Sequence, residues 1–106
     1  MYIDAHAHIY HEFTDESARR YIENARKLGI ERVAALAIGK TIYPATNEWY
    51  AEQINKYQDF FFGLANVDPD ETKVEELDAL TRPPWGGFKV LFARQPYGSK
   101  DYFPLW

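Results

Sequence analysis

The sequence contains no cysteine, which excludes disulfide bonds and thiolate metal ligands. No apolar run approaches the ~20 residues that a membrane-spanning helix needs. The 12 Lys and Arg residues are outnumbered by 16 Asp and Glu residues, and they form no basic cluster typical of nucleic-acid binding. Residues 1–4 do not begin a signal peptide. We therefore expect a cytoplasmic protein with neither a membrane nor a nucleic acid as its partner.

The chain does contain enough apolar surface for a packed core. Hydrophobic residues make up 46% of its 106 residues, and aromatic residues alone make up 17%. The whole chain, residues 1–106, is predicted to be a single domain of modest size. It is about two-fifths as long as a complete (β/α)₈ barrel of roughly 250 residues.

Short apolar segments alternate with amphipathic segments along the chain. The apolar segments predict strands at about 2–9, 32–38, 60–67 and 87–92. Helices are predicted between them at about 15–28, 47–57 and 72–80. Thr14 and Thr46 are the expected N-caps of the first two helices, and Gly29 is the expected end of the first.

This alternation predicts right-handed βαβ units and a parallel sheet. The strands begin about 30 residues apart, which agrees with the roughly 31 residues per unit of a (β/α)₈ barrel. A doubly wound sheet has a similar spacing, but no glycine-rich phosphate loop follows the first strand. We therefore predict an α/β fold, namely an incomplete TIM-like (β/α)₈ barrel that consists of its N-terminal part, about four βα units.

The residues that indicate chemistry are Asp4, His6 and His8 in the first predicted strand. Because side chains alternate across a strand, these three are expected to share one face, and the apolar residues between them the other. Two imidazoles so placed can converge on one cation. An isolated pair of this kind is usually a surface feature, but here it ends the first strand of a βα series, where barrel active sites are built. His6 and His8 are therefore predicted to be metal ligands.

The segment Ile3-Asp4-Ala5-His6-Ala7-His8 resembles the first-strand signature of the amidohydrolase superfamily, in particular its branch of metal-dependent hydrolases and decarboxylases. Three later segments resemble that branch in the same order: Gly63–Pro69, Glu75–Leu77 and Gly86–Val90. The resemblance implies a barrel with one or two divalent metals at the carboxyl ends of its strands. It also implies a small-molecule substrate, attacked by a metal-activated water or decarboxylated with the help of the metal.

In the family that this chain resembles, further ligands come from histidines on the fifth and sixth strands, and an aspartate on the eighth is the base. This sequence has no positions that match them, so we assign no catalytic residue and expect the full active site to be lacking. Zinc is the expected metal for imidazole and carboxylate ligands, with manganese or iron as alternatives.

Four further residues are weaker candidates for the pocket or for a contact with a ligand. Asp4 is expected either to orient an imidazole or to make a structural hydrogen bond. His11 would lie at the pocket mouth or in solvent, and Asn66 could reach the pocket from the third strand. Lys89 resembles a fourth-strand lysine that bridges two metals when carboxylated in some amidohydrolases. The alternative for Lys89 is an ion pair or a contact with substrate.

The sequence is consistent with two interpretations of the function. In the first, the chain is a segment of a metal-dependent hydrolase or decarboxylase. In the second, it is a non-catalytic half-barrel that acts by self-association or by pairing with a missing chain. Four strands of an eight-stranded barrel leave two open edges, which is a liability unless they are paired. The second interpretation therefore predicts a homo-oligomer that completes the barrel.

Overall fold

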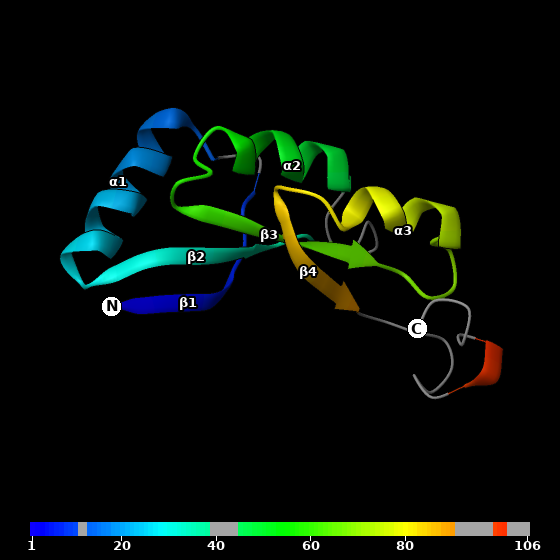
Figure 1. Cartoon of the computed structure of the whole chain (residues 1–106). Coiled ribbons are helices and arrows are strands. Elements are labelled where there is room, and N and C mark those ends of the chain that lie inside the picture. Colours follow the sequence, from blue (N-terminus) through cyan, green and yellow to red (C-terminus); the bar gives the residue numbers. More distant parts are fainter. Residues whose placement is uncertain (11–12, 39–44, 91–98, 102–106) are drawn as a thin grey trace.

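A computed structural model describes residues 1–10, 13–38, 45–90 and 99–101 of the chain (Figure 1). Strands and helices alternate through these ranges, and their order is β1 (Tyr2–Ala7), α1 (Asp15–Lys27), β2 (Ile30–Leu36), α2 (Asn47–Asn55), β3 (Phe61–Val67), α3 (Val74–Leu80) and β4 (Trp85–Val90). No helix within these ranges is long and apolar enough to cross a membrane. The predicted alternation of strands and helices is confirmed.

The four strands form one parallel sheet in the order β1-β2-β3-β4. Each strand therefore pairs with the next one along the chain, and the crossovers all progress in one direction across the sheet. Right-handed crossovers that progress in this way place their helices on the same face. Figure 1 shows α1, α2 and α3 on one side of the sheet, and no described α-helix on its other side. A doubly wound sheet would reverse direction and carry helices on both faces.

The helix ends follow the local sequence signals. Thr14 caps α1 by accepting a hydrogen bond from the backbone N–H of Ser17, and the Ser17 hydroxyl accepts one from the N–H of Thr14. Thr46 caps α2 by accepting a hydrogen bond from the backbone N–H of Trp49. Gly29 follows α1 with a φ of 80°, a conformation that glycine adopts without steric cost. These three predictions are confirmed.

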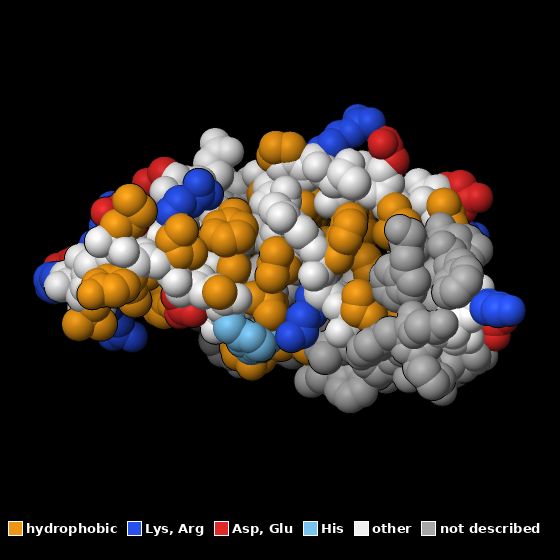
Figure 2. Space-filling view, turned by 60° about the horizontal axis from the view of Figure 1, so that its bottom comes forward, with side chains coloured by type: hydrophobic (Ala, Val, Ile, Leu, Met, Phe, Trp, Pro, Cys, Tyr) orange, Lys and Arg blue, Asp and Glu red, His pale blue; other side chains and the backbone are white. Residues whose placement is uncertain are grey.

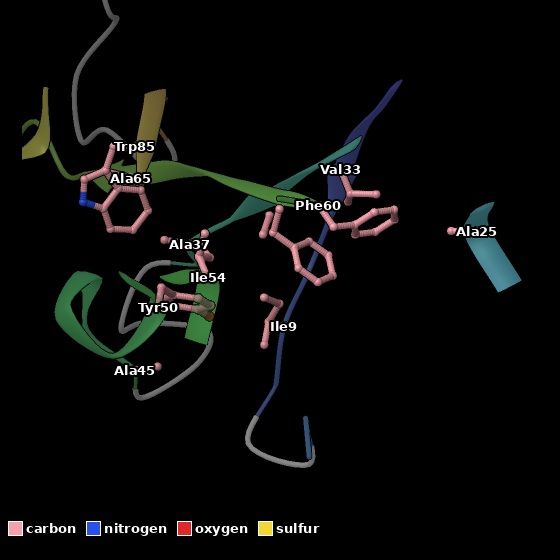
Figure 3. Close-up of a cluster of buried hydrophobic side chains, with 12 residues drawn as sticks. Ile9, Ala25, Val33, Ala37, Ala45, Tyr50, Ile54, Phe60, Ala65 and Trp85 are labelled. Carbon is pink, nitrogen blue, oxygen red and sulfur yellow. The ribbon is translucent and has the colours of Figure 1, made fainter. Parts of the chain in front are cut away.

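The hydrophobic core lies between the helices and the sheet (Figure 3). Its largest fully buried side chains are Tyr50 and Ile54 from α2, Val33 and Val67 from the sheet, and Phe60 just before β3. The strand residues reach it because alternate residues of β3, at positions 61, 63, 65 and 67, face the helices and are buried. Burial of apolar surface is favourable by ~25 cal/mol per Å², and the helices therefore cover the face of the sheet that carries these side chains.

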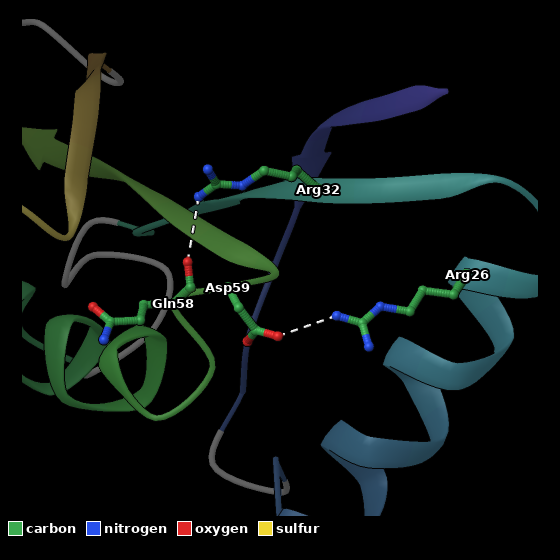
Figure 4. A network of polar contacts seen from close by, with 4 residues as sticks. All are labelled: Arg26, Arg32, Gln58 and Asp59. Carbon is green, nitrogen blue, oxygen red and sulfur yellow. Dashed lines mark hydrogen bonds and ion pairs between the residues drawn. The ribbon is translucent and has the colours of Figure 1, made fainter.

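Two polar contacts connect the segments at the amino ends of the strands (Figure 4). Arg26 of α1 forms an ion pair with Asp59 at 3.1 Å, and Arg32 of β2 donates a hydrogen bond to the backbone carbonyl of Gln58. The Arg32 guanidinium also lies 5.4 Å from the centre of the Phe62 ring. The ion pair is exposed on both sides, so its expected contribution is at most about 1 kcal/mol.

The face of the sheet away from the helices is partly exposed. The β3 residues that point to it, Phe62, Leu64 and Asn66, are half-buried, whereas their neighbours in the strand are buried. Figure 2 shows this face, with hydrophobic side chains across it and the histidine side chains beside a basic side chain. We call it the open face, and it carries the candidate site.

Candidate metal site

Between Asp4 and Ala7, strand β1 contains one extra residue relative to β2. The register shifts the other way between Tyr2 and Ile3, which pair with Ile30 and Arg32. Asp4 pairs with Val33 and Ala7 pairs with Ala35, so three steps along β1 match two steps along β2. Paired residues in a parallel sheet point to the same face, and both Val33 and Ala35 point into the core beneath the helices. The irregularity therefore interrupts the alternation of side chains between Asp4 and Ala7.

The prediction that Asp4 shares a face with His6 and His8 is wrong for this reason. Asp4 lies on the helix side of the sheet, like its partner Val33. The pKa of Tyr21 in α1 agrees with this placement, since it is raised first by burial and then by the negative charge of Asp4. Ala7 and Ile9 pack with the core, so the two histidines that alternate with them point to the open face.

The two imidazoles of the motif converge. The Nε2 atoms of His6 and His8 are 3.1 Å apart, and their rings are perpendicular with centres 4.9 Å apart. With metal–nitrogen bonds of ~2.0–2.1 Å, this separation corresponds to an angle of about 100° at a shared metal, which suits tetrahedral zinc. The same separation also permits a hydrogen bond between the two rings when one of them carries a proton on Nε2.

His8 has a second contact that orients its ring. Its Nδ1 atom lies 3.3 Å from the backbone carbonyl oxygen of Leu36 in β2. A carbonyl only accepts hydrogen bonds, so Nδ1 is the protonated nitrogen of neutral His8 in this contact. The lone pair then lies on Nε2, the atom that faces His6. Metal-binding histidines commonly have this arrangement, in which a backbone carbonyl fixes the tautomer.

Lys89 and Asn66 lie at the same end of the sheet as the histidines. They pair with each other across β3 and β4, so their side chains point to the same, open face. Both are half-buried. The structure thus brings four of the predicted residues to one face: His6, His8, Asn66 and Lys89. His11, also named from the sequence, lies outside the described residues.

The end of β3 is held by Asn47, a residue that no sequence pattern identified as part of a site. The Asn47 side chain donates to the backbone carbonyl of Asn66 at 3.0 Å and accepts from its backbone N–H at 2.9 Å. These two hydrogen bonds fasten the first turn of α2 to the carboxyl end of the strand. An asparagine directly after a helix N-cap was the available signal, but its partner 19 residues away could not be read from the sequence.

The described part of the chain contains no group of three or more His, Cys, Asp or Glu side chains close enough to hold a metal ion. The two histidines therefore supply a pair of ligands and not a complete set. Three protein ligands are typical of catalytic zinc. The donor chemistry of the pair fits a divalent transition metal, and any third ligand has to come from elsewhere.

One comparison with known proteins shows what this fold is similar to. Over 94% of its length the chain matches 42% of a solved chain with a TM-score of 0.64 and 19% sequence identity. That protein is described as a probable 2-pyrone-4,6-dicarboxylic acid hydrolase from Acinetobacter baumannii, with citric acid bound. The fold of this chain is similar to part of a hydrolase. At 19% identity the match concerns the fold alone.

The chain spans about two-fifths of the length of that solved chain. No family model matches the sequence. No curated protein matches it either. The similarity therefore rests on four parallel strands that alternate with helices.

Proposed function

We propose that this chain provides the first four βα units of a metal-dependent hydrolase barrel of the amidohydrolase superfamily, with His6 and His8 as metal ligands. The observation that carries the proposal is the 3.1 Å separation of their Nε2 atoms. The His8 contact with Leu36 supports it, because it leaves the Nε2 lone pair available. The similarity of the fold to part of a hydrolase, and the signature around the two histidines, agree with the proposal.

A divalent metal at this position would act as a Lewis acid and lower the pKa of a water molecule toward ~7. The contribution of this chain is to hold two imidazoles at the carboxyl end of β1, where (β/α)₈ enzymes build their active sites. Lys89 adds a cationic side chain on the same face. A carbonyl or carboxylate of a small substrate is the group that such a face would bind.

The proposal is tested by the metal content of the purified chain after dialysis against Zn²⁺, measured by inductively coupled plasma mass spectrometry. We expect close to one zinc per chain and its loss in the His6→Ala/His8→Ala double variant. Glu52→Ala is the control, because it removes an exposed side chain that could bind a metal from α2, on the helix side of the sheet, and it should keep the metal. No zinc in the wild type, or equal zinc in the double variant, would overturn the proposal.

A second candidate function is self-association, and the exposed edges of the sheet favour it. Tyr2 and Ile3 on β1 are 68% and 58% exposed, and Phe88 on β4 is 46% exposed. Large apolar side chains thus lie uncovered on both edge strands. If β4 of each copy paired with β1 of the other copy, two chains would form a closed parallel barrel of eight strands. The exposed apolar side chains on the edge strands would then be covered.

Sedimentation velocity tests the second candidate with a matched pair of variants. Phe88→Glu should dissociate a dimer, because it places a charge at the paired edge. Val74→Glu is the control, since Val74 is 47% exposed, much like Phe88, but lies in helix α3 and not on an edge strand. A wild-type chain that sediments as a monomer at high micromolar concentration would rule this candidate out.

A further inference from the structure

The irregularity in β1 decides which residues of the motif reach the open face. Asp4 lies in register with Val33, and Ala7 lies in register with Ala35. Ala5 and His6 lie between these two registers and have no paired partner in β2. An extra residue of this kind changes the direction of the side chains that follow it in the strand.

Without the extra residue, the strand would present the opposite set of side chains to the core. Regular alternation from Asp4 would turn His6 and His8 toward the helices and Ala7 toward the open face. In the structure, Ala7 packs against the core and Ile9 is only 2% exposed. The convergence of the two imidazoles on the open face therefore depends on the extra residue.

Asp4 makes the hydrogen bond that accompanies this change of direction. Its Oδ1 atom accepts from the backbone N–H of His6 at 3.0 Å. A backbone N–H that leaves a ladder requires another acceptor, and a carboxylate two residues earlier is well suited to provide one. Asp4 thus replaces, for His6, the carbonyl that a regular parallel pairing with β2 would supply.

We propose that Asp4 is a positioning residue for the metal ligands, and that it acts through its hydrogen bond to the backbone of His6 rather than through its charge. This inference rests on the proposed function, because the geometry that it explains is that of the His6–His8 pair. Asp4 lies on the helix side of the sheet, and the histidines lie on the open side. Its carboxylate therefore acts through the backbone that connects them.

Two substitutions separate the hydrogen-bond acceptor of the Asp4 side chain from its negative charge. Asp4→Asn keeps an oxygen that can accept from the His6 N–H but removes the charge. Asp4→Ala removes both. Asp68→Ala is the matched control, because the Asp68 carboxylate accepts from the backbone N–H of Asp70 at 2.9 Å in a turn after β3. It therefore removes the same type of contact, two residues apart, at a different place in the fold.

The first measurement is titration of the full chain and its variants with Co²⁺, followed by the visible absorption bands of the bound metal. We expect wild-type affinity and spectrum for Asp4→Asn and Asp68→Ala. We expect Asp4→Ala to bind about tenfold to a hundredfold more weakly, the usual effect of losing a residue that orients metal ligands. Unchanged binding by Asp4→Ala would overturn the proposal, and so would an Asp4→Asn variant as weak as Asp4→Ala.

The second measurement separates this proposal from the proposed function. In the metal-free chain, nuclear Overhauser contacts between the imidazole protons of His6 and His8 should be present in the wild type and in Asp4→Asn and lost in Asp4→Ala. If the wild type binds no Co²⁺ but shows this pattern, the metal site is wrong and the positioning role of Asp4 stands. If all variants keep the contacts, Asp4 does not position the rings.

Discussion

The Nδ1 atom of His8 lies 3.3 Å from the carbonyl oxygen of Leu36, across the pairing of β1 with β2. This contact connects the tautomer of a predicted ligand to the neighbouring strand. Since the carbonyl belongs to the backbone, no substitution at position 36 removes the acceptor. The orientation of the His8 ring is thus a consequence of strand pairing. The tautomer that this contact requires can be tested by spectroscopy.

We predict that neutral His8 carries its proton on Nδ1. In nitrogen-15 spectra of the imidazoles at a pH where His8 is neutral, Nδ1 should show the shift of a protonated ring nitrogen and Nε2 that of an unprotonated one. A His8 ring with the proton on Nε2 would contradict the contact with Leu36. Addition of Zn²⁺ should then change the Nε2 signal more than the Nδ1 signal, because Nε2 is the coordinating atom in our proposal.

Asn47 is predicted to be important for stability through its two hydrogen bonds to the backbone of Asn66. Asn47→Ala leaves a half-buried N–H and C=O without these partners, and we expect a loss of about 1–3 kcal/mol in the free energy of unfolding. Urea denaturation followed by circular dichroism measures this loss. Asn24→Ala, at an exposed position in α1, is the control and should change stability by less than about 0.5 kcal/mol. Equal effects of the two substitutions would contradict the role of Asn47.

Gly63 is predicted to tolerate no side chain. A Cβ atom at this position would lie 2.4 Å from Cε3 of Trp85 and 3.0 Å from Cδ1 of Ile54. Overpacking of this type costs about 1–3 kcal/mol, so Gly63→Ala should lower the midpoint of urea unfolding clearly. At Gly87 the nearest atom is a Leu64 methyl at 3.1 Å, which can move, so Gly87→Ala should have the smaller effect. The reverse order would argue against the packing of Trp85 on β3.

The hydrogen bond from the Tyr57 hydroxyl to the Asp15 carboxylate, 2.5 Å long, predicts a dependence of stability on high pH. The pKa of Tyr57 is raised, first by this hydrogen bond, then by burial and by the charge of Asp15. A tyrosine with a raised pKa in the folded state adds stability below pH ~10, and this stability is lost as the pH rises through the folded-state pKa. The difference in unfolding midpoint between the wild type and Tyr57→Phe should therefore shrink above pH 10. A difference that stays constant up to pH 12 would contradict the hydrogen bond.

The sequence was sufficient to predict the strands, the parallel sheet and the first two helix caps, because each depends on local signals. Thr14 and Thr46 cap α1 and α2 as expected, and Gly29 ends α1. The last helix begins at Val74, not at Thr72. The reason is a turn in which the Thr72 hydroxyl accepts from the N–H of Asp68 while the Thr72 N–H donates to the Asp68 carbonyl.

The site was predictable only in part. The residue types and their spacing identified His6 and His8, but the face assigned to Asp4 followed from strict alternation along a regular strand. Whether a strand contains an extra residue depends on its register with the neighbouring strand, and the sequence of one strand alone does not reveal that register. The contact of His8 with a backbone carbonyl has no sequence signal at all, because every residue has a carbonyl group.

The most direct test of the metal site is X-ray absorption at the zinc edge of the chain after it is loaded with one equivalent of Zn²⁺. Our account predicts two imidazole nitrogens at ~2.0–2.1 Å among the ligands, with the imidazole scattering pattern absent from the His6→Ala/His8→Ala variant. A zinc shell of oxygen atoms alone, or an imidazole pattern that is the same in the wild type and in the double variant, would contradict the assignment of His6 and His8 as metal ligands.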